Sequence, residues 1–221
     1  MAVTSGEQTL KLHLGCGSFV APGWENIDKS WGVTLSRIPG ARAALARLRV
    51  LTPEQAAAVF PAGIVRADVR KGLPYGAGAA VAVYSSHMIE HMSRWQGLAL
   101  LRECHRVLAP GGRVRLATPD LRALVDEYTR GETRRGVTAG DSFMQQLETH
   151  RDEPGSVAQR LVRRFLTAPH QWVYDEHSLM RLLEEAGFAD ARRRGFRDSD
   201  IEGIDVVEQR EESLFVEGRR P

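Results

Sequence analysis

A short stretch near the start of the chain has the residue types and spacing of a nucleoside-binding site. Gly15 and Gly17 follow an alternating apolar segment at residues 10–14, and Asp28 closes a second one at residues 26–28. Glycine lets the backbone approach a ligand closely, and a carboxylate at a strand end can accept hydrogen bonds from ribose hydroxyls. The residues that we expect to contact a ligand here are Leu14, Gly15, Cys16, Gly17, Asp28 and Lys29.

The spacing departs from the dinucleotide-binding fingerprint, which needs a third glycine and an acid about 20 residues further on. Phe19 and Val20 occupy the positions of that third glycine, and only ten residues separate Gly17 from Asp28. The first crossover helix must therefore be very short or absent, so no strong pyrophosphate site is expected at its N-terminus. We predict a nucleoside without phosphates as the ligand, with a plain turn at residues 15–17 as the alternative.

Asp68 closes a third strand-like segment at residues 64–68. Its carboxylate could accept a hydrogen bond from the exocyclic amine of a purine. The alternative is that Asp68 caps a turn or a helix, because aspartate often accepts from backbone amides at such positions.

An apolar, buried-type strand is followed by Ser85, Ser86 and His87. Histidine suits a general base near neutral pH, and His87 is the first candidate for that role. The other candidates are Asp120, which follows the fifth strand, and His170, which lies in a later loop. A structural or cofactor-contact role is the alternative for each of the three.

Residues 87–91 also form the literal pattern H-x-x-E-H of a group of zinc proteases. Two histidines four positions apart on a helix can hold a zinc ion. However, the motif directly follows an apolar strand, and no third ligand stands at a characteristic spacing. We therefore expect no metal ion, and we expect Glu90 and His91 to orient His87 or to pack beside it.

The order of the segments predicts an α/β fold of the Rossmann-like, doubly wound class. We expect a mostly parallel seven-stranded sheet with an antiparallel edge strand, because βαβ units come first and a pair of strands comes last. The chain is predicted to be a single domain, residues 1–221, with a small helical cap. The cap would come from insertions at about 30–60 and 131–168, the second with helices near residues 143–150 and 157–166.

The composition is that of a globular protein. Of the 221 residues 43% are hydrophobic, and the net charge of +2 is too balanced to predict nucleic-acid binding. Two cysteines are too few for a disulfide framework, which favours a reducing cytoplasm. No apolar run could span a membrane and no signal peptide is evident. Richness in arginine and alanine favours a bacterial source, and a homodimer is left open.

These motifs resemble those of class I S-adenosylmethionine-dependent methyltransferases. The resemblance runs through most of the chain, in the stretches LHLGCGS, GWENID, VRADV, SSHMIEHM, LRECHRVLAPGGRVRLATPD and YDEHSLMRLLEEAGF. It is closest to a small bacterial branch with a shortened first helix, whose members often act on sugars or secondary metabolites.

The resemblance implies that S-adenosylmethionine is the cofactor and S-adenosylhomocysteine the product. The contacts that it implies are the methionine portion for Gly15 and Gly17, the ribose for Asp28, the adenine for Asp68 and Val69, and the methionine end for Ser85 and Ser86. His13 stands where many members have an acid that contacts the cofactor's amine. That amine is therefore expected to meet backbone carbonyls or another carboxylate.

The expected function is methyl transfer to a small molecule. We favour the hydroxyl of a sugar or secondary metabolite as acceptor and keep an amine or a carboxylate open. A non-catalytic or regulatory nucleoside-binding module is the alternative, because a fold does not establish turnover. Neither a membrane nor a nucleic acid is expected as a partner.

Overall fold

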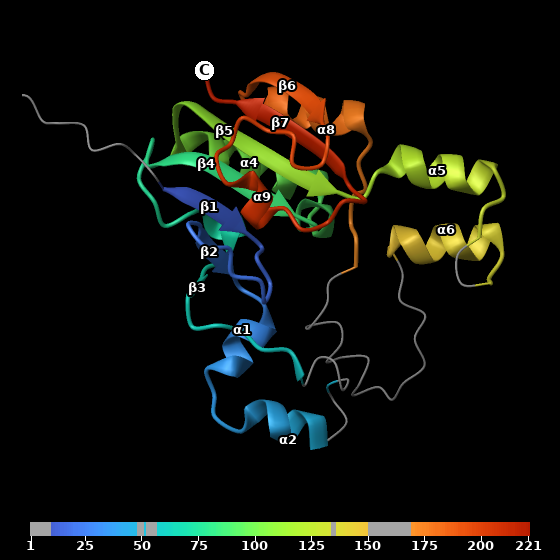
Figure 1. Ribbon diagram of the computed structural model, residues 1–221, viewed down its shortest axis with the longest axis horizontal. Coiled ribbons are helices and arrows are strands. Elements are labelled where there is room, and N and C mark those ends of the chain that lie inside the picture. Colours follow the sequence, from blue (N-terminus) through green and yellow to red (C-terminus); the bar gives the residue numbers. More distant parts are fainter. Residues whose placement is uncertain (1–9, 48–50, 52–56, 134–135, 150–168) are drawn as a thin grey trace, which may run out of the picture.

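A seven-stranded sheet forms the centre of the computed structural model, which describes residues 10–47, 51, 57–133, 136–149 and 169–221 (Figure 1). The strands are β1 (Lys11–Leu14), β2 (Glu25–Asp28), β3 (Ile64–Arg66), β4 (Ala80–Ser86), β5 (Leu108–Thr118), β6 (Ala189–Arg194) and β7 (Leu214–Arg219). Their order across the sheet is β3-β2-β1-β4-β5-β7-β6.

The direction of the strands agrees with the predicted topology. β1 to β5 run parallel to one another, and β7 runs antiparallel to both β5 and β6 at one side of the sheet. Residues 15–24 between β1 and β2 contain no helix, so the prediction of a missing first crossover helix is confirmed. The expectation of a mostly parallel Rossmann-like sheet with an antiparallel edge is confirmed as well.

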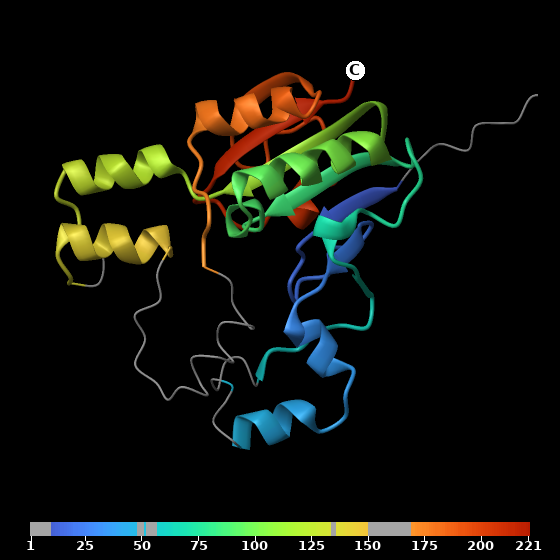
Figure 2. The same cartoon turned by 180° about the vertical axis from the view of Figure 1, so that it is seen from behind.

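Helices cover the two faces of the sheet unequally (Figures 1 and 2). The helices described are α1 (Trp31–Ser36), α2 (Ala41–Arg47), α4 (Arg94–Val107), α5 (Leu121–Thr129), α6 (Ala139–Leu147), α8 (Glu176–Glu185) and α9 (Ile204–Val207), with 3-10 turns η1 (Val69–Lys71) and η2 (Ile89–His91). The larger apolar core lies between the sheet and the pair α4 and α8, and the short α9 packs on the opposite face.

Local sequence explains how the strands and α4 form. The alternation in β1 buries Leu12 and Leu14 completely in the core. Ser93 begins α4 with a capping box, because its hydroxyl accepts from the Gln96 amide while the Gln96 side chain accepts from the Ser93 amide. The helix and the strands thereby fix where the loops at the carboxyl ends of the strands begin.

Two helical segments stand away from the sheet in both views. α1 and α2 follow β2, and α5 and α6 form a hairpin after β5 (Figure 2). These helices lie in or beside the predicted cap segments, with α6 beginning four residues earlier than expected. The helix predicted near residues 157–166 lies outside the described residues. In the described part of the chain, no helix has the length and apolar character needed to cross a membrane.

Candidate active site

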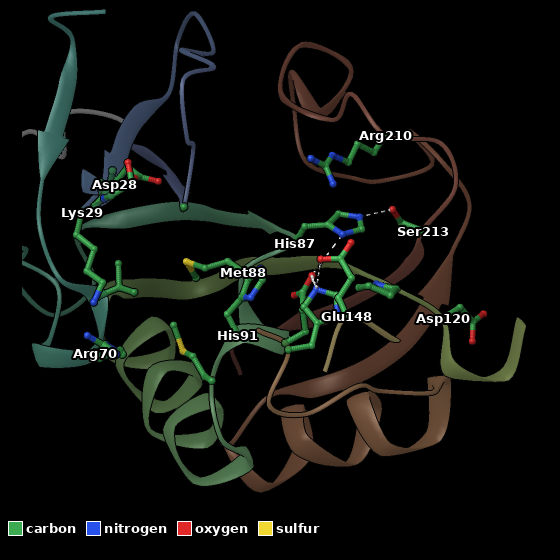
Figure 3. A pocket seen from close by; sticks show the side chains of 18 of the residues that line it. Asp28, Lys29, Arg70, His87, Met88, His91, Asp120, Glu148, Arg210 and Ser213 are labelled. Carbon is green, nitrogen blue, oxygen red and sulfur yellow. Dashed lines mark hydrogen bonds and ion pairs between the residues drawn. The ribbon is translucent and has the colours of Figure 1, made fainter. Parts of the chain in front are cut away.

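A cavity of about 1680 Å³ lies at the carboxyl ends of the parallel strands (Figure 3). Residues at or just after the end of each parallel strand line it, among them Gly15, Asp28, Asp68, His87 and Asp120. Pockets for single small ligands commonly measure about 300–1,000 Å³, so this cavity has room for a nucleoside and a second small molecule. Lys29, Val69 and His170 line it too, so eight of the residues predicted from the sequence meet in one place.

Asp28 joins the glycine turn to the end of β2. Its Oδ2 accepts from the Gly17 amide at 2.9 Å, and its Oδ1 accepts from the Ser30 amide at 2.5 Å. The amides of Gly15 and Cys16 both donate to the carbonyl oxygen of the residue before Asp28, at 2.8 and 3.2 Å. The carboxylate is 9% exposed, and each oxygen keeps lone pairs for a further donor from the cavity.

Gly15 is needed both for its backbone angle and for its lack of a side chain. Its φ is +71°, and a Cβ there would lie 2.7 Å from Met88 Sδ. Gly15→Ala should therefore destabilise the protein by about 1–2 kcal/mol from backbone strain alone. Gly17→Ala is the matched control, because φ is +59° there but a Cβ added to Gly17 would meet no atom within 4 Å. Denaturant unfolding should show the larger loss for Gly15→Ala, and equal losses would exclude the Met88 contact as a cause.

Asp68 fills the role of a cap as well as lining the cavity. Its side chain accepts from the Arg70 amide at the start of η1 and forms ion pairs with Arg70 at 3.0 Å and Lys29 at 3.2 Å. The Arg70 guanidinium, and then Lys29, hold the pKa of this carboxyl well below its usual range. Val69 is buried and lines the cavity beside it. The adenine contact of Asp68 and Val69 stays a prediction, for which these residues are well placed.

Several of the predicted contact residues do not line the described cavity. The wall includes Gly15 but not Leu14, Cys16, Gly17, Ser85 or Ser86. Burial raises the pKa of the Cys16 thiol to about 12, so this thiol stays neutral at physiological pH. The Ser85 hydroxyl is buried with no hydrogen-bond partner among the described residues.

His13 has a structural partner instead of a place in the cavity. Its Nδ1 lies 3.0 Å from Asn26 Oδ1, which also accepts from the Ala21 amide, so Nδ1 carries the donated hydrogen. Burial lowers the pKa of His13. This arrangement agrees with the expectation that His13 does not hold the cofactor's amine.

His87 is held by two neighbours at the end of β4. Its Nε2 lies 2.9 Å from the Ser213 hydroxyl, and its Nδ1 lies 3.3 Å from Glu90 Oε1 (Figure 3). The backbone φ of His87 is +48°, a left-handed conformation that is uncommon outside glycine and that clusters at functional sites. The contact with Glu90 agrees with the expectation that Glu90 orients His87.

Asp120 lines the cavity, but its carboxylate is engaged elsewhere. It caps α5 by accepting from the amides of Arg122 and Ala123, and it lies 3.5 Å from the Arg193 guanidinium. A base must be free to take a proton, so the geometry favours the structural alternative for Asp120. Its catalytic role stays an untested prediction.

His170 enters the cavity from the loop before α8 and is buried. Its Nδ1 lies 2.9 Å from the Leu147 carbonyl oxygen, and its Nε2 faces Glu90 Oε1 at 4.0 Å and Glu148 Oε2 at 3.7 Å. Burial lowers the pKa of His170 more than the nearby carboxylates raise it. A neutral His170 is the form expected at physiological pH.

The H-x-x-E-H motif is not on an α-helix. Residues 89–91 form the 3-10 turn η2, which does not give His87 and His91 the facing arrangement of a zinc-protease helix. The objection to a metalloprotease is thereby strengthened. The motif nevertheless gathers Glu90 and His91 against His170 from far along the chain.

The cavity wall also includes residues that the sequence did not predict. Met88 packs against Gly15, and Glu148, Arg210 and Ser213 come from the end of α6 and from the loop before β7 (Figure 3). No local motif marks the residues from these late segments, because only the folded chain brings them to the strand ends.

A family model described as a methyltransferase domain matches residues 25–192, which is more than half of the chain. The chain belongs to the methyltransferase domain family. The match confirms the resemblance to class I S-adenosylmethionine-dependent methyltransferases, while the narrower bacterial branch stays a prediction. No curated protein matches the sequence.

Solved structures similar to this methyltransferase include the S-adenosylmethionine-dependent methyltransferase SibL. It is 22% identical with a TM-score of 0.47, over 96% of this chain and 50% of SibL. PigF with SAH is 15% identical with a TM-score of 0.44, over 96% of this chain and 49% of PigF. A possible histamine N-methyltransferase from Thermotoga maritima is 16% identical with a TM-score of 0.48, over 96% and 82%. The chain thus spans about half the length of SibL and PigF.

S-adenosylmethionine is the cofactor that membership of this family implies. The chain has residues that fit it: a close-approach glycine at Gly15, and a carboxylate at Asp28 that lines the same cavity. The turn between them has no helix N-terminus, which suits a ligand without phosphates. Gly15, Asp28 and the turn between them are therefore suited to bind an adenosine with an attached amino acid.

Proposed function

We propose that this methyltransferase moves a methyl group from S-adenosylmethionine to a hydroxyl of a small molecule, such as a sugar or a secondary metabolite. The supporting observation is a single cavity that runs from Gly15 and Asp28 to His87. A cofactor on the strand ends would thus lie in the same space as a basic side chain and an acceptor. The membrane and nucleic acids have no part in this proposal.

Each side of the cavity has its own task in this proposal. Asp28 accepts from the ribose hydroxyls, Val69 lies beside the adenine, and Gly15 lets the backbone approach the methionine portion. When bound, S-adenosylmethionine supplies a methyl group that leaves its sulfur as the acceptor attacks, giving S-adenosylhomocysteine. Alignment of the acceptor with the methyl group can lower the activation barrier by about 7–11 kcal/mol when the groups are well oriented.

His87 is the proposed general base. Its Nδ1 faces the Glu90 carboxylate, which favours a hydrogen on Nδ1 and leaves Nε2 to take a proton. Ser213 bonds Nε2 in this structure, and its hydroxyl marks where an acceptor hydroxyl can reach the base. The acceptor proton then passes to Nε2 of His87 as the oxygen becomes the nucleophile.

The alternative is a regulatory module that binds a nucleoside without turnover. A closed cofactor pocket with no adjoining space for an acceptor would favour such a module. The continuous cavity, with His87 and His170 in its wall, instead favours an enzyme.

Two measurements test the proposed function. Mass spectrometry of the purified protein is expected to detect co-bound S-adenosylhomocysteine or S-adenosylmethionine. Incubation with cofactor labelled in its methyl group, together with sugars and metabolite extracts, is expected to yield a labelled O-methyl product. Cofactor binding with no labelled product from any acceptor class would favour the regulatory module.

A further inference from the structure

The carboxylate of Glu90 is fully buried and poorly satisfied. It is 0% exposed, and within the described ranges neither of its oxygens has a hydrogen-bond partner. Its Oε1 lies 3.3 Å from His87 Nδ1 and 4.0 Å from His170 Nε2, without hydrogen-bond geometry. Burial of a carboxylate without partners is unfavourable because the group loses its hydration, so a bound group that compensates it is expected.

Two imidazoles present nitrogens to the same place. His91 Nδ1 is buried and has no hydrogen-bond partner in the part of the chain that the structure describes. His170 Nδ1 donates to the Leu147 carbonyl oxygen, so His170 Nε2 keeps its lone pair on the side of Glu90. A neutral imidazole with one bare nitrogen is the form that binds a metal ion, and a second-shell carbonyl commonly fixes this tautomer.

Backbone hydrogen bonds hold the loop of His170 against η2. The amides of Gln171 and Trp172 donate to the Glu90 carbonyl oxygen at 2.7 and 3.1 Å. The Gln171 side chain donates to the His91 carbonyl oxygen at 2.9 Å. These hydrogen bonds between segments distant in the sequence bring the side chains of Glu90, His91 and His170 together.

We propose that Glu90, His91 and His170 bind one divalent transition-metal ion, with zinc as the best match. Their candidate ligand atoms all lie within 4.8 Å of one another. Zinc bonds to these donor types measure about 2.0–2.2 Å, so side-chain movements of about an ångström bring the ligands together. Two histidines and a glutamate are a donor set of zinc sites that keep a fourth position open. The sequence alone predicts no metal ion here.

The ion would lie beside the proposed base. All three ligands line the cavity that also includes His87, so the open fourth position of the ion can face an acceptor hydroxyl. The ion can then act on that hydroxyl as a Lewis acid. His87 Nδ1, 3.3 Å from Glu90, is placed to orient the ligating carboxylate. This use of the ion rests on the proposed function, whereas binding of the ion does not.

Metal titration of the full chain tests the site. Chelator-treated protein is titrated with Zn²⁺ by calorimetry and with Co²⁺ by visible absorption, and one equivalent is expected to bind. Glu90→Gln, His91→Ala and His170→Ala should each weaken binding by about tenfold or more. His177→Ala is the matched control, because His177 is an exposed histidine on α8. Zinc should raise the Tm of the wild type and of His177→Ala, and should raise it less in the ligand variants.

The outcomes separate the metal site from the proposed function. A wild-type chain that binds neither ion, or ligand variants that fold and bind as tightly as the wild type, would overturn the site. A titration of the metal-free protein with S-adenosylmethionine is run in parallel. Cofactor binding without zinc binding keeps the proposed function and rejects the ion, whereas zinc binding without cofactor binding does the reverse.

Discussion

Replacement of His87 by asparagine is expected to lower kcat for methyl transfer by about 100- to 10,000-fold, the usual contribution of a general base. Asparagine tolerates the positive φ of +48° at this position, so the variant removes the basic nitrogen and keeps the backbone. Affinity for S-adenosylmethionine should stay unchanged, because the proposed cofactor contacts lie at Gly15, Asp28 and Val69. Single-turnover transfer of labelled methyl and a calorimetric cofactor titration measure the two quantities.

The matched control for this prediction is His177→Asn, which changes an exposed histidine of α8. Thermal unfolding of both variants verifies that they fold. A folded His87→Asn variant with the wild-type kcat would exclude His87 as the base. A loss of cofactor affinity in place of kcat would reassign His87 to the cofactor.

Asp28→Ala is expected to weaken binding of S-adenosylmethionine by about 10- to 150-fold. This range corresponds to a charged hydrogen bond of about 1.5–3 kcal/mol. The carboxylate also accepts from the amides of Gly17 and Ser30, so some loss of stability is expected beside the loss of affinity. Calorimetry measures the affinity, and denaturant unfolding measures the stability.

Two further variants separate the binding effect of Asp28 from its structural one. Asp28→Asn keeps the shape and one acceptor oxygen, so it should lose affinity with a smaller change in unfolding. Asp126→Asn removes a partly exposed carboxylate of α5 that pairs with Arg122, and it should change neither quantity. An unchanged cofactor affinity in both Asp28 variants would reject the ribose contact.

The residues at the strand ends could be predicted because their signal is local. Alternation before Gly15 and the apolar run before His87 identify strands, and parallel strands place their following residues at one edge of the sheet. The short distance from Gly17 to Asp28 correctly predicted a connection without a helix. These inferences need only neighbouring residues and the geometry of a parallel sheet.

The remaining contacts depend on segments that meet only in the folded chain. Nothing near Ser213 in the sequence indicates that it approaches His87, and nothing near the candidate His170 indicates that it lies beside Glu90. The sequence also does not show which groups a carboxylate will contact. Asp120 lies at a strand end as Asp28 does, but its side chain caps α5. The motif at residues 87–91 shows that residues able to bind a metal ion are present. The 3-10 turn determines that Glu90 and His91 are the ones that face His170.

The position of Ser85 and Ser86 shows a further limit of strand-end reasoning. Both residues belong to β4, which extends two residues beyond the predicted strand, and neither lines the described cavity. Side chains alternate between the faces of a strand, so a one-residue difference in where it ends decides which group meets a ligand. Their contact with the methionine end stays a prediction.

A crystal structure of the protein with S-adenosylhomocysteine would show directly whether the strand ends hold the cofactor. We expect a nucleoside across the ends of β1, β2 and β3, with both ribose hydroxyls about 2.5–3.0 Å from the Asp28 carboxylate. We also expect the adenine beside Val69 and the sulfur facing the part of the cavity that holds His87. A nucleoside bound elsewhere, or in this cavity without a hydrogen bond to Asp28, would refute the proposed cofactor site.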